Sequence, residues 1–546
     1  MSTTNSIGEL RSAVEAAASN LRGGEVAGPE PTLDRPPKPE LGDYSSNAAM
    51  LLAGPLGDNP RAIAARLRDE LERQLGATGS LERIEVAGPG FVNFYLSDAW
   101  HRGALAALIE AGEELGPEPT ASPEKVLVEF VSANPTGPLH VGGGRHAAYG
   151  DAIVRLLKAV GHEVEREYYV NDAGGQIGRF ADSIAARMGG GEPPEDGYEG
   201  AYVTELAERI GAEGIDASDR EAVGRRGVEL ILDEVRGTLE RFGVQFDTWF
   251  HERDLYARGE VESALEDLDG RRHTYRSEDA LWLRSTSFGD DKDRVLIRAN
   301  GEPTYLAADV AYHWDKLQRG FVRLIDVLGA DHHGYVGRIG AAIEALGADP
   351  GAFEALIMNL VHIIAEGERA QMSKRRGDFV SLDELVDAIG VDAARWFMLW
   401  RDHQTTVDLD LELASRQSSE NPVYYVQYAH ARIASILRKA GPAAAAAAAG
   451  PGETSAPMEP SERALVKRLL EFPDEVREAA SRRAPHRICA YSTAVASDFH
   501  AFYRDCQVLG AEGDGLERSR LALCLATKRT IAGALGLLGI SAPERM

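Results

Sequence analysis

The strongest constraint on the fold comes from one stretch in which a strand-like run, a Pro- and Gly-rich loop, a helical pattern and another strand-like run follow one another. Residues 126–131 (VLVEFV) are mostly apolar and β-branched, which is typical of a buried strand. We expect a helix from about residue 144 to 160 and the next strand over 163–169. This order predicts a parallel sheet, in which ligands bind beyond the carboxyl ends of the strands. A second block, the strand 324–328 followed by a helix over 338–346, supports the same sheet.

The chain of 546 residues is longer than one hydrophobic core supports, so several domains are expected. We predict an N-terminal α+β domain over residues 1–115, a Rossmann-like parallel-sheet domain over 124–381 and a C-terminal all-α helical bundle over 382–546. The second domain would carry a helical insertion around 190–240, and the third an exposed Ala-, Pro- and Gly-rich linker over 441–460. The fold class is therefore α/β, with smaller domains at both ends.

Local patterns add detail to the two outer domains. In the N-terminal domain they predict helices over 7–21, 44–52 and 60–75 and strands over 83–86 and 91–96. From residue 382 onward the pattern is helical throughout, and we expect two or three amphipathic helices in roughly the last 85 residues.

Composition excludes several classes of protein. Hydrophobic residues make up 44% of the chain, and no apolar run approaches the ~18 residues of a membrane span. The N-terminus lacks the order of a secretory signal, so we expect a cytoplasmic protein. The cysteines, Cys489, Cys506 and Cys524, lack the spacing of a disulfide framework or a zinc site. Taken alone, a net charge of -27 argues against nucleic-acid binding. Such binding would need a local basic face.

The loop after the first strand carries the chemistry. Residues 129–145 read EFVSANPTGPLHVGGGR. Gly142, Gly143 and Gly144 leave no side chains between a strand end and a helix N-terminus, so phosphates could approach the backbone amides and the helix dipole. His140 at the loop edge could donate a hydrogen bond to a phosphate oxygen.

This loop resembles the signature region of class I aminoacyl-tRNA synthetases, and its long form S-A-N-P-T-G-P-L-H-V-G is similar to that of the arginyl-tRNA synthetase family. The family loop usually reads His-x-Gly-His, and Gly143 replaces the second histidine here. The segment YVNDAGGQI, beginning at Tyr169, and the segment 329–335 (GADHHGY) also resemble this family. The resemblance implies an ATP-dependent ligase that forms arginyl-adenylate and esterifies arginine to tRNA(Arg).

A second half-site follows in residues 371–378 (QMSKRRGD), which resemble the family's Lys-Met-Ser-Lys-Ser loop. The resemblance implies that Met372, Ser373 and Lys374 contact ATP. Lys374, with Arg375 beside it, would stabilise the negative charge that develops on the leaving pyrophosphate. We expect ATP to act as a substrate with Mg²⁺ on its phosphates.

Recognition of arginine requires carboxylates, because the guanidinium group is planar and permanently charged. By resemblance, Ser132 and Asn134 would bind the α-amino group of arginine, and Glu252 and Asp309 its guanidinium group. Tyr305 lies one helical turn before Asp309 and is expected on the same face. The resemblance also places His333 in the arginine site; that list of expected ligands is Ser132, Asn134, Glu252, Tyr305, Asp309 and His333.

Two regions are expected to contact tRNA. A predicted helix in the C-terminal domain carries Tyr425, Tyr428 and Arg432, and resembles the start of the family's anticodon-binding domain. Phe91 and Asn93 in the N-terminal domain could stack on and hydrogen-bond an unpaired base, or could be strand residues. Positive charge concentrates in the last domain, in Lys467, Arg468, Arg477, Arg482, Arg483, His486 and Arg487.

Some alternatives remain open. Asp331, His332 and His333 are adjacent, but no third ligand has metal-site spacing, so we expect no protein-bound transition metal. Another nucleotidyl transferase with an H-x-G-H loop would lack the two RNA-binding domains. A non-catalytic paralogue that binds tRNA or senses arginine is favoured only by Gly143 and Gln371. We expect a monomer whose partners are tRNA(Arg), L-arginine and ATP, with no membrane association.

Overall fold

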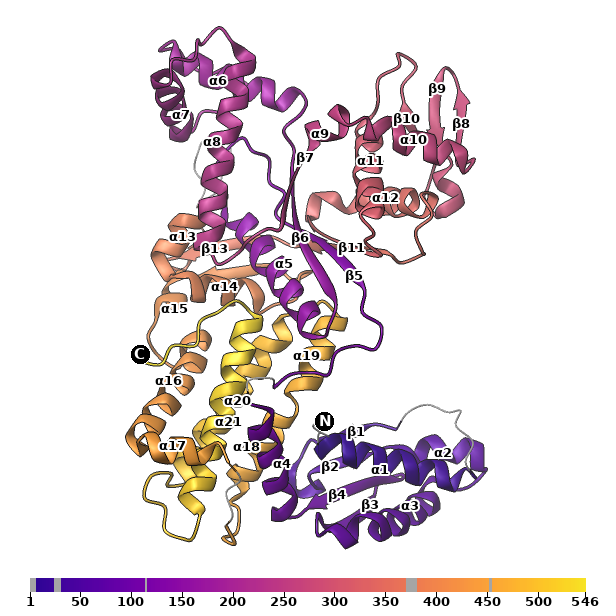
Figure 1. Ribbon diagram of the computed structural model, residues 1–546, viewed down its shortest axis with the longest axis vertical. Coiled ribbons are helices and arrows are strands. Elements are labelled where there is room, and N and C mark those ends of the chain that lie inside the picture. Colours follow the sequence, from indigo (N-terminus) through magenta and orange to yellow (C-terminus); the bar gives the residue numbers. More distant parts are fainter. Residues whose placement is uncertain (1–5, 24–30, 113–114, 370–380, 451–453) are drawn as a thin grey trace.

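The expected parallel sheet lies near the middle of an elongated molecule (Figure 1). The structure is a computed structural model that describes residues 6–23, 31–112, 115–369, 381–450 and 454–546. All five strands of this sheet run parallel, in the order β12-β11-β5-β6-β7. The strands are β5 (Lys125–Glu129), β6 (Glu163–Val170), β7 (Thr248–His251), β11 (Arg323–Gly329) and β12 (Phe353–Met358). The predicted fold class is confirmed.

The order of the strands creates a switch point between β5 and β11. From β5 the chain proceeds to β6 and β7 on one side, whereas β11 and β12 lie on the other. Helix α5 (Val141–Ala159) connects β5 to β6, and its many buried residues cover the sheet. At such a switch point the loops leave in opposite directions, so a crevice opens beyond the strand ends.

Two excursions leave the sheet and form the two upper lobes in Figure 1. Between β6 and β7 lie α6 (Gly175–Met188), α7 (Ala201–Ala212) and α8 (Arg220–Arg241), which include the insertion expected to be helical. The second excursion, between β7 and β11, contains an antiparallel sheet that was not predicted from the sequence. Its elements are α9 (Glu252–Ala257), α10 (Glu260–Gly270), β8 (Thr274–Ser277), β9 (Ala280–Leu283), η3 (Ser285–Phe288), β10 (Arg294–Ile297) and α11 (Tyr305–Gln318).

The N-terminal unit is an antiparallel sheet of order β1-β2-β4-β3 packed against helices. The helix predicted over 44–52 is wrong at its start, because Tyr44–Ser46 is a strand whose residues Tyr44 and Ser46 are buried beside β4. Asn47 then precedes α2. The elements are α1 (Ser6–Leu21), β1 (Leu33–Asp34), η1 (Pro39–Leu41), β2 (Tyr44–Ser46), α2 (Ala48–Leu56), α3 (Pro60–Leu75), η2 (Gly76–Thr78), β3 (Leu81–Ala87), β4 (Phe91–Leu96) and α4 (Asp98–Ala111).

The C-terminal part is mainly a helical bundle, with three departures from expectation. Strand β15 (Val407–Asp410) pairs parallel with β13, so the region is not helical throughout. The last part contains four long helices rather than two or three. The predicted linker contains a helix, α17 (Pro442–Ala448), which packs against α16 and α21. A run of alanines has high helix propensity and fits closely against a neighbouring helix.

The elements of this part, together with those that lead into it, are η4 (Ala330–His332), α12 (His333–Ala345), β13 (Val361–Ala365), β14 (Glu368–Arg369), α13 (Leu382–Ile389), α14 (Val391–Leu399), β15, α15 (Leu411–Ser415), α16 (Pro422–Ala440), α17, α18 (Pro460–Leu470), α19 (Phe472–Ser481), α20 (His486–Asp505) and α21 (Leu516–Leu537). Within the described part of the chain, every helix is too short or too polar to cross a lipid bilayer.

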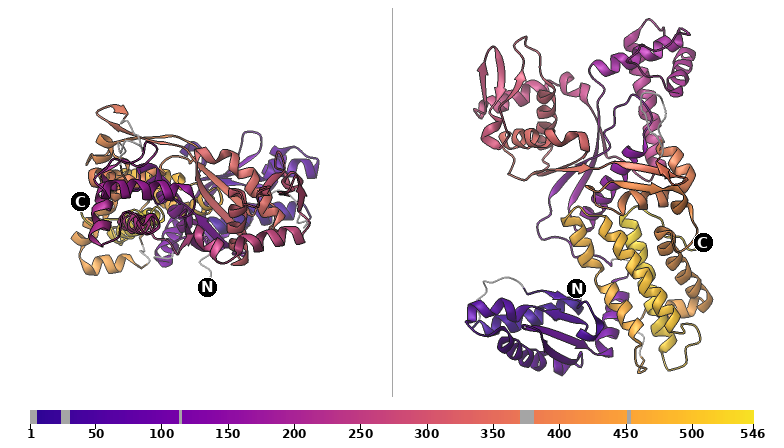
Figure 2. Two further views of the ribbon diagram at one scale, coloured as in Figure 1. Left: turned by 90° about the horizontal axis from the view of Figure 1, so that it is seen from above. Right: turned by 180° about the vertical axis from the view of Figure 1, so that it is seen from behind.

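The N-terminal unit packs against the C-terminal helical bundle, as the right-hand view in Figure 2 shows. Helix α4 contacts α18 and α21. Lys467 Nζ lies 2.6 Å from Asp43 Oδ1, and Arg463 pairs with Glu82 at 3.2 Å and with Asp98 at 2.8 Å. These ion pairs fix the N-terminal unit against the helical bundle.

Candidate active site

A cavity of about 830 Å³ opens at the switch point of the parallel sheet. Its walls come from the loop after β5, the N-terminus of α5, helix α11, the end of β11 and the turn between β12 and β13. The residues that line it include Glu129, Ser132, Asn134, His140, Gly142, Gly143, His146, Tyr169, Asp309, Tyr312, Asp326, Tyr335 and Asn359. Loops far apart in the sequence therefore meet in one place, as the sequence predicted.

The loop after β5 is held in a strained conformation. Val131 and Ser132 have φ angles of 69° and 39°, a region that side-chain-bearing residues rarely occupy. The Ser132 hydroxyl donates to Glu129 Oε1 at 2.9 Å and accepts from the Tyr169 backbone N–H at 3.1 Å. Strain of this kind costs roughly 1 to 3 kcal/mol per residue and marks functional loops. It brings Asn134 to the cavity wall.

His140 caps the N-terminus of α5. Its Nδ1 accepts a hydrogen bond from the Gly142 backbone N–H at 2.9 Å. The ring proton of neutral His140 is therefore on Nε2, where it serves as a hydrogen-bond donor. The remaining backbone amides and the dipole of α5 present positive charge at the cavity.

The three glycines do not serve one purpose. A Cβ atom on Gly142 would lie 2.7 Å from the His140 ring, and one on Gly143 would lie 2.4 Å from Leu139 Cδ1. Both residues line the cavity. Gly144 is outside that lining, because it packs against Leu382, 2.6 Å from where its Cβ would be. Glycine at 143 thus lets the loop close on Leu139.

His146 was not among the predicted ligands, yet it lines the same cavity one turn along α5. Burial, together with the charges of His140 and Arg145, lowers the pKa of His146 to about 4. The ring is therefore neutral at pH 7 and contributes hydrogen bonds rather than charge. Its position three residues after Gly143, about one helical turn, was the available signal.

Arg145 is fully buried and anchors the adjoining turns. Its guanidinium group donates to the carbonyl oxygens of Asn359 at 2.7 Å, Leu360 at 3.5 Å, Asp402 at 3.0 Å and Thr405 at 2.9 Å. Burial lowers the pKa of Arg145 to about 10. The cavity wall between β12 and β13 is therefore tied directly to α5.

The two acids predicted to bind guanidinium lie near each other, since the charge of Glu252 acts on Asp309. Burial raises the pKa of Asp309 to about 7, and the negative charges of Glu252 and Glu129 contribute. Burial also raises the pKa of Glu252, which is only 8% exposed and accepts a hydrogen bond from Tyr169. Asp309 lines the cavity, and Glu252 lies outside that lining beside Tyr169. Two carboxylates that repel each other in this way form a site for a cation.

Tyr305 is not brought into the cavity. It is 80% exposed and is the first residue of α11. Helical side chains lean toward the N-terminus, so the first residue of a helix extends beyond it into solvent. Tyr312, three residues after Asp309 on the same helix face, lines the cavity instead, and its hydroxyl donates to Glu167 at 2.7 Å.

The remaining predicted ligands are only partly located. Met372, Ser373, Lys374 and Arg375 lie outside the described residues. His333 begins α12 at the cavity edge, and its side chain is outside the described part. No group of three or more His, Cys, Asp or Glu side chains suited to a metal occurs among the described residues.

A second cavity, of about 700 Å³, lies in the C-terminal bundle between α16 and α20. Tyr428 is 38% exposed, and the Arg432 guanidinium lies 5.4 Å above its ring. Tyr424 stacks against Tyr428 with an interplanar angle of 12°. Tyr425 packs against the core and against His500, at 4.9 Å between ring centroids. Exposed rings beside an arginine form a surface on which a nucleic-acid base could stack.

The predicted tRNA residues of the N-terminal unit differ in exposure. Asn93 is 4% exposed, and its Oδ1 accepts from the Ser45 hydroxyl at 2.7 Å. Phe91, at the start of β4, is 39% exposed. Asn93 therefore holds the sheet together, and Phe91 is the residue at the surface.

Most of the basic residues predicted to concentrate positive charge in the last domain are paired with acids. The cations pair with nearby acids, because the acidic excess supplies a partner on almost every neighbouring turn. Arg483 pairs with Glu354 at 3.1 Å and Arg487 with Glu475 at 3.0 Å. The other pairs are Lys467 with Asp43, Arg468 with Glu471 and Asp498, Arg477 with Asp474, and Arg482 with Glu478.

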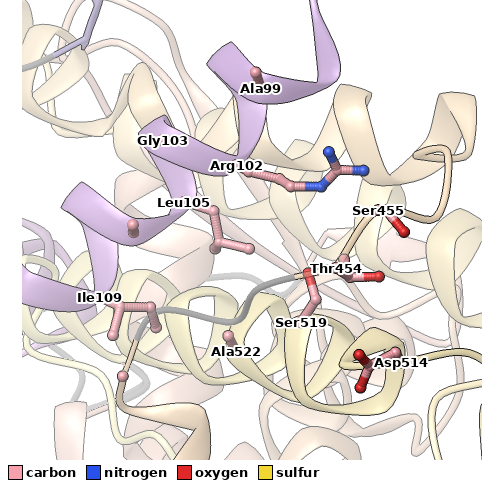
Figure 3. Close-up of a pocket in the computed structure, with 12 residues that line it drawn as sticks. Ala99, Arg102, Gly103, Leu105, Ile109, Thr454, Ser455, Asp514, Ser519 and Ala522 are labelled. Carbon is pink, nitrogen blue, oxygen red and sulfur yellow. The ribbon is translucent and has the colours of Figure 1, made fainter.

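A further cavity, of about 560 Å³, lies beside the contact between α4 and α21 (Figure 3). Arg102 of α4 extends across it toward the bundle and donates to the Ala456 carbonyl oxygen. Its other walls are mostly small or apolar, such as Leu105 and Ala522. It lies at the contact between the two end domains and away from the sheet.

The chain matches three family models. They are the arginyl tRNA synthetase N terminal domain over residues 8–96, the catalytic domain of class I (R) tRNA synthetases over 105–189, and the DALR anticodon binding domain over 426–546. With the parallel sheet, the signature loop and the helical bundle, these matches define a class I aminoacyl-tRNA synthetase.

Individual relatives narrow the class. The chain is 47% identical to an arginine–tRNA ligase from Desulforudis audaxviator (strain MP104C), over 98% of this chain and 97% of that protein. The chain belongs to the arginyl-tRNA synthetase family. It superposes on the Thermus thermophilus arginyl-tRNA synthetase with a TM-score of 0.76 and 28% identity, over 98% and 99% of the two chains. A Mycobacterium tuberculosis methionyl-tRNA synthetase, at 14% identity and a TM-score of 0.55 over 76% and 91%, shares the fold.

Proposed function

We propose that the chain activates L-arginine with ATP and transfers the arginyl group to the 3′-terminal ribose of tRNA(Arg). A carboxylate oxygen of arginine attacks the α-phosphorus, and the bond to pyrophosphate breaks. A ribose hydroxyl then attacks the carbonyl carbon, and AMP leaves. The observation that carries the proposal is the repelling acid pair Glu252 and Asp309 beside the cavity that holds the signature loop.

The two ends of arginine would be bound by different elements. Asn134, with Ser132 beside it on the strained loop, would take the α-amino group. Glu252 and Asp309 would bind the guanidinium group, whose forked donors require carboxylate acceptors. Its positive charge would offset the negative charges of both acids. In this orientation the carboxylate of arginine would point toward the N-terminus of α5 and the bound nucleotide.

ATP would lie against the N-terminus of α5. His140 Nε2 and the backbone at Gly142 and Gly143 would contact its phosphates. Lys374 and Arg375 would neutralise the leaving pyrophosphate, and Mg²⁺ would bind through the phosphates, a geometry that needs few protein ligands. Catalysis would then consist mainly of alignment and charge stabilisation.

Binding of tRNA would use the aromatic cavity of α16 and α20. Tyr428 and Arg432 would stack on a base, and Tyr425 would support them from the core. Phe91 is the exposed candidate in the N-terminal unit. We further propose a cytoplasmic monomer.

Pyrophosphate exchange tests the activity directly. Each amino acid would be supplied in turn, with and without tRNA(Arg). We expect exchange only when the amino acid supplied is arginine. Asp309→Asn should raise the KM for arginine at least tenfold and leave the KM for ATP within about twofold, because a neutral amide loses the charge-assisted pair. Exchange with another amino acid would refute the proposed substrate. An equal increase in the KM values for arginine and ATP would refute the role of Asp309.

A further inference from the structure

Lys316 of α11 is a fully buried ammonium group beneath the central cavity. Its Nζ lies 2.7 Å from Glu129 Oε2 and 3.1 Å from Asp326 Oδ1. It also lies 4.2 Å from the centre of the Tyr312 ring. Its own exposure is 0%, so solvent does not screen these contacts. A buried charge is costly unless it is paired, and here it is paired twice.

Both partners of Lys316 line the cavity at the switch point. Glu129 ends β5, and its second oxygen accepts from the Ser132 hydroxyl at 2.9 Å. Asp326 lies on β11, and its second oxygen is 3.2 Å from His313 Nε2. All four carboxylate oxygens of Glu129 and Asp326 are therefore engaged.

Glu252 and Asp309 differ from these two acids. Among the described residues, neither carboxylate forms an ion pair with a lysine, arginine or histidine side chain, and His313 Nδ1 lies 2.8 Å from the backbone oxygen of Asp309 rather than from its carboxylate. Burial raises the pKa of both acids, and nearby carboxylates, Asp172 for Glu252 and Glu252 for Asp309, add to this effect. The site thus contains one pair of acids that the protein balances and one pair that it leaves for a ligand.

We propose that Lys316 is a positioning and specificity-determining residue that neutralises Glu129 and Asp326, so that the guanidinium of arginine binds only at Glu252 and Asp309. The inference rests on the proposed function of the cavity. Lys316 also holds Glu129 against Ser132, and therefore maintains the strained loop that presents Asn134.

Loss of Lys316 would change alignment more than affinity. The cavity would become more negative, so a cationic substrate would still be attracted. Its guanidinium or α-amino group would then also pair with Glu129 or Asp326, and the carboxylate would no longer point at the nucleotide. A misplacement of about 1 Å costs on the order of a hundredfold in rate. We therefore expect kcat to fall while the KM for arginine changes little.

The test is arginine-dependent pyrophosphate exchange on the full chain with saturating tRNA(Arg). Lys316→Met should lower kcat roughly ten- to hundredfold, with the KM for ATP within about twofold. Adding Asp326→Asn removes one surplus negative charge. The kcat of the double variant should therefore be at least about threefold higher than that of Lys316→Met alone. The recovery distinguishes charge balance from simple loss of packing, which a second substitution would worsen.

Lys125→Met is the matched control. Lys125 lies on β5 four residues before Glu129, and its Nζ donates to the Arg319 carbonyl oxygen at 2.9 Å without a carboxylate partner. Its removal should leave kcat unchanged. Thermal unfolding reports whether each variant folds, and Lys316→Gln, which is polar but uncharged, replaces Lys316→Met if the latter does not.

The outcomes separate the two claims. An unchanged kcat in a folded Lys316 variant, or a loss that Asp326→Asn does not reduce, overturns the role of Lys316. Absence of arginine-dependent exchange in the unsubstituted chain overturns the proposed function itself, independently of any variant.

Discussion

The raised pKa of Asp309 predicts that arginine binding depends on pH near neutrality. Burial and the charge of Glu252 raise this pKa from 3.8 to about 7 in the empty site. If only the carboxylate binds guanidinium, the KM for arginine is multiplied by one plus the ratio of protonated to ionised Asp309. That ratio is about 10 at pH 6 and about 0.1 at pH 8, so the KM should be about tenfold higher at pH 6.

The assay is exchange kinetics from pH 5.5 to 8.5 at saturating ATP and tRNA, with the KM for ATP as the internal control. Asp309→Asn should remove the pH dependence of the arginine KM. A KM for arginine that stays constant between pH 6 and pH 8 in the unsubstituted enzyme would refute the reasoning.

Stability gives an independent readout of the same carboxyl group. Because its folded pKa exceeds its unfolded pKa, Asp309 stabilises the fold at low pH, and that contribution is lost as pH rises through about 7. Asp309→Asn should therefore raise the unfolding free energy at pH 8, by on the order of 2 to 4 kcal/mol, and by progressively less below pH 7. A higher melting temperature together with weaker arginine binding would show that the acid is retained for function.

Three other changes test neighbouring features. Gly143→Ala forces a methyl group against Leu139 and should cost about 1 to 3 kcal/mol in thermal unfolding, whereas Gly178→Ala, which meets no atom within 4 Å in α6, should be neutral or stabilising. Arg145→Lys cannot bond four carbonyl oxygens at once, so it should lower the melting temperature and raise the KM for ATP. Tyr428→Ala should weaken tRNA binding by about 1 to 3 kcal/mol in a filter-binding assay, without changing the KM for arginine.

The sequence predicted the features that depend on local pattern. The strand before the signature loop, the helix after it and the acid at 309 are each set by residues within one turn or one strand, and the structure places them at one cavity. The family resemblance was confirmed by relatives that cover nearly the whole chain. His140 was predicted at the loop edge and the helix from about residue 144, whereas α5 begins at Val141 and His140 caps it.

Features that depend on the exact end of an element or on distant partners were missed. Tyr305 and Asp309 have the right spacing, but the helix begins at Tyr305, which sends that ring into solvent. The basic residues of the last domain were counted without the acids that face them from other elements, such as Glu354 opposite Arg483. Lys316 gave no signal, since its partners lie on β5 and β11, far from it along the chain.

The pairing of so many cations with internal acids has a consequence for how the enzyme meets its polyanionic substrate. With a net charge of -27, the approach of tRNA is opposed at long range, and adding electrolyte screens that repulsion. Within the described part of the last domain, cations such as Arg477, Arg482 and Arg487 are already paired with acids, so they should release few counterions and affinity should decline only slowly as ionic strength increases. Association should therefore be slowest in dilute buffer, the reverse of the usual behaviour of proteins that bind nucleic acids.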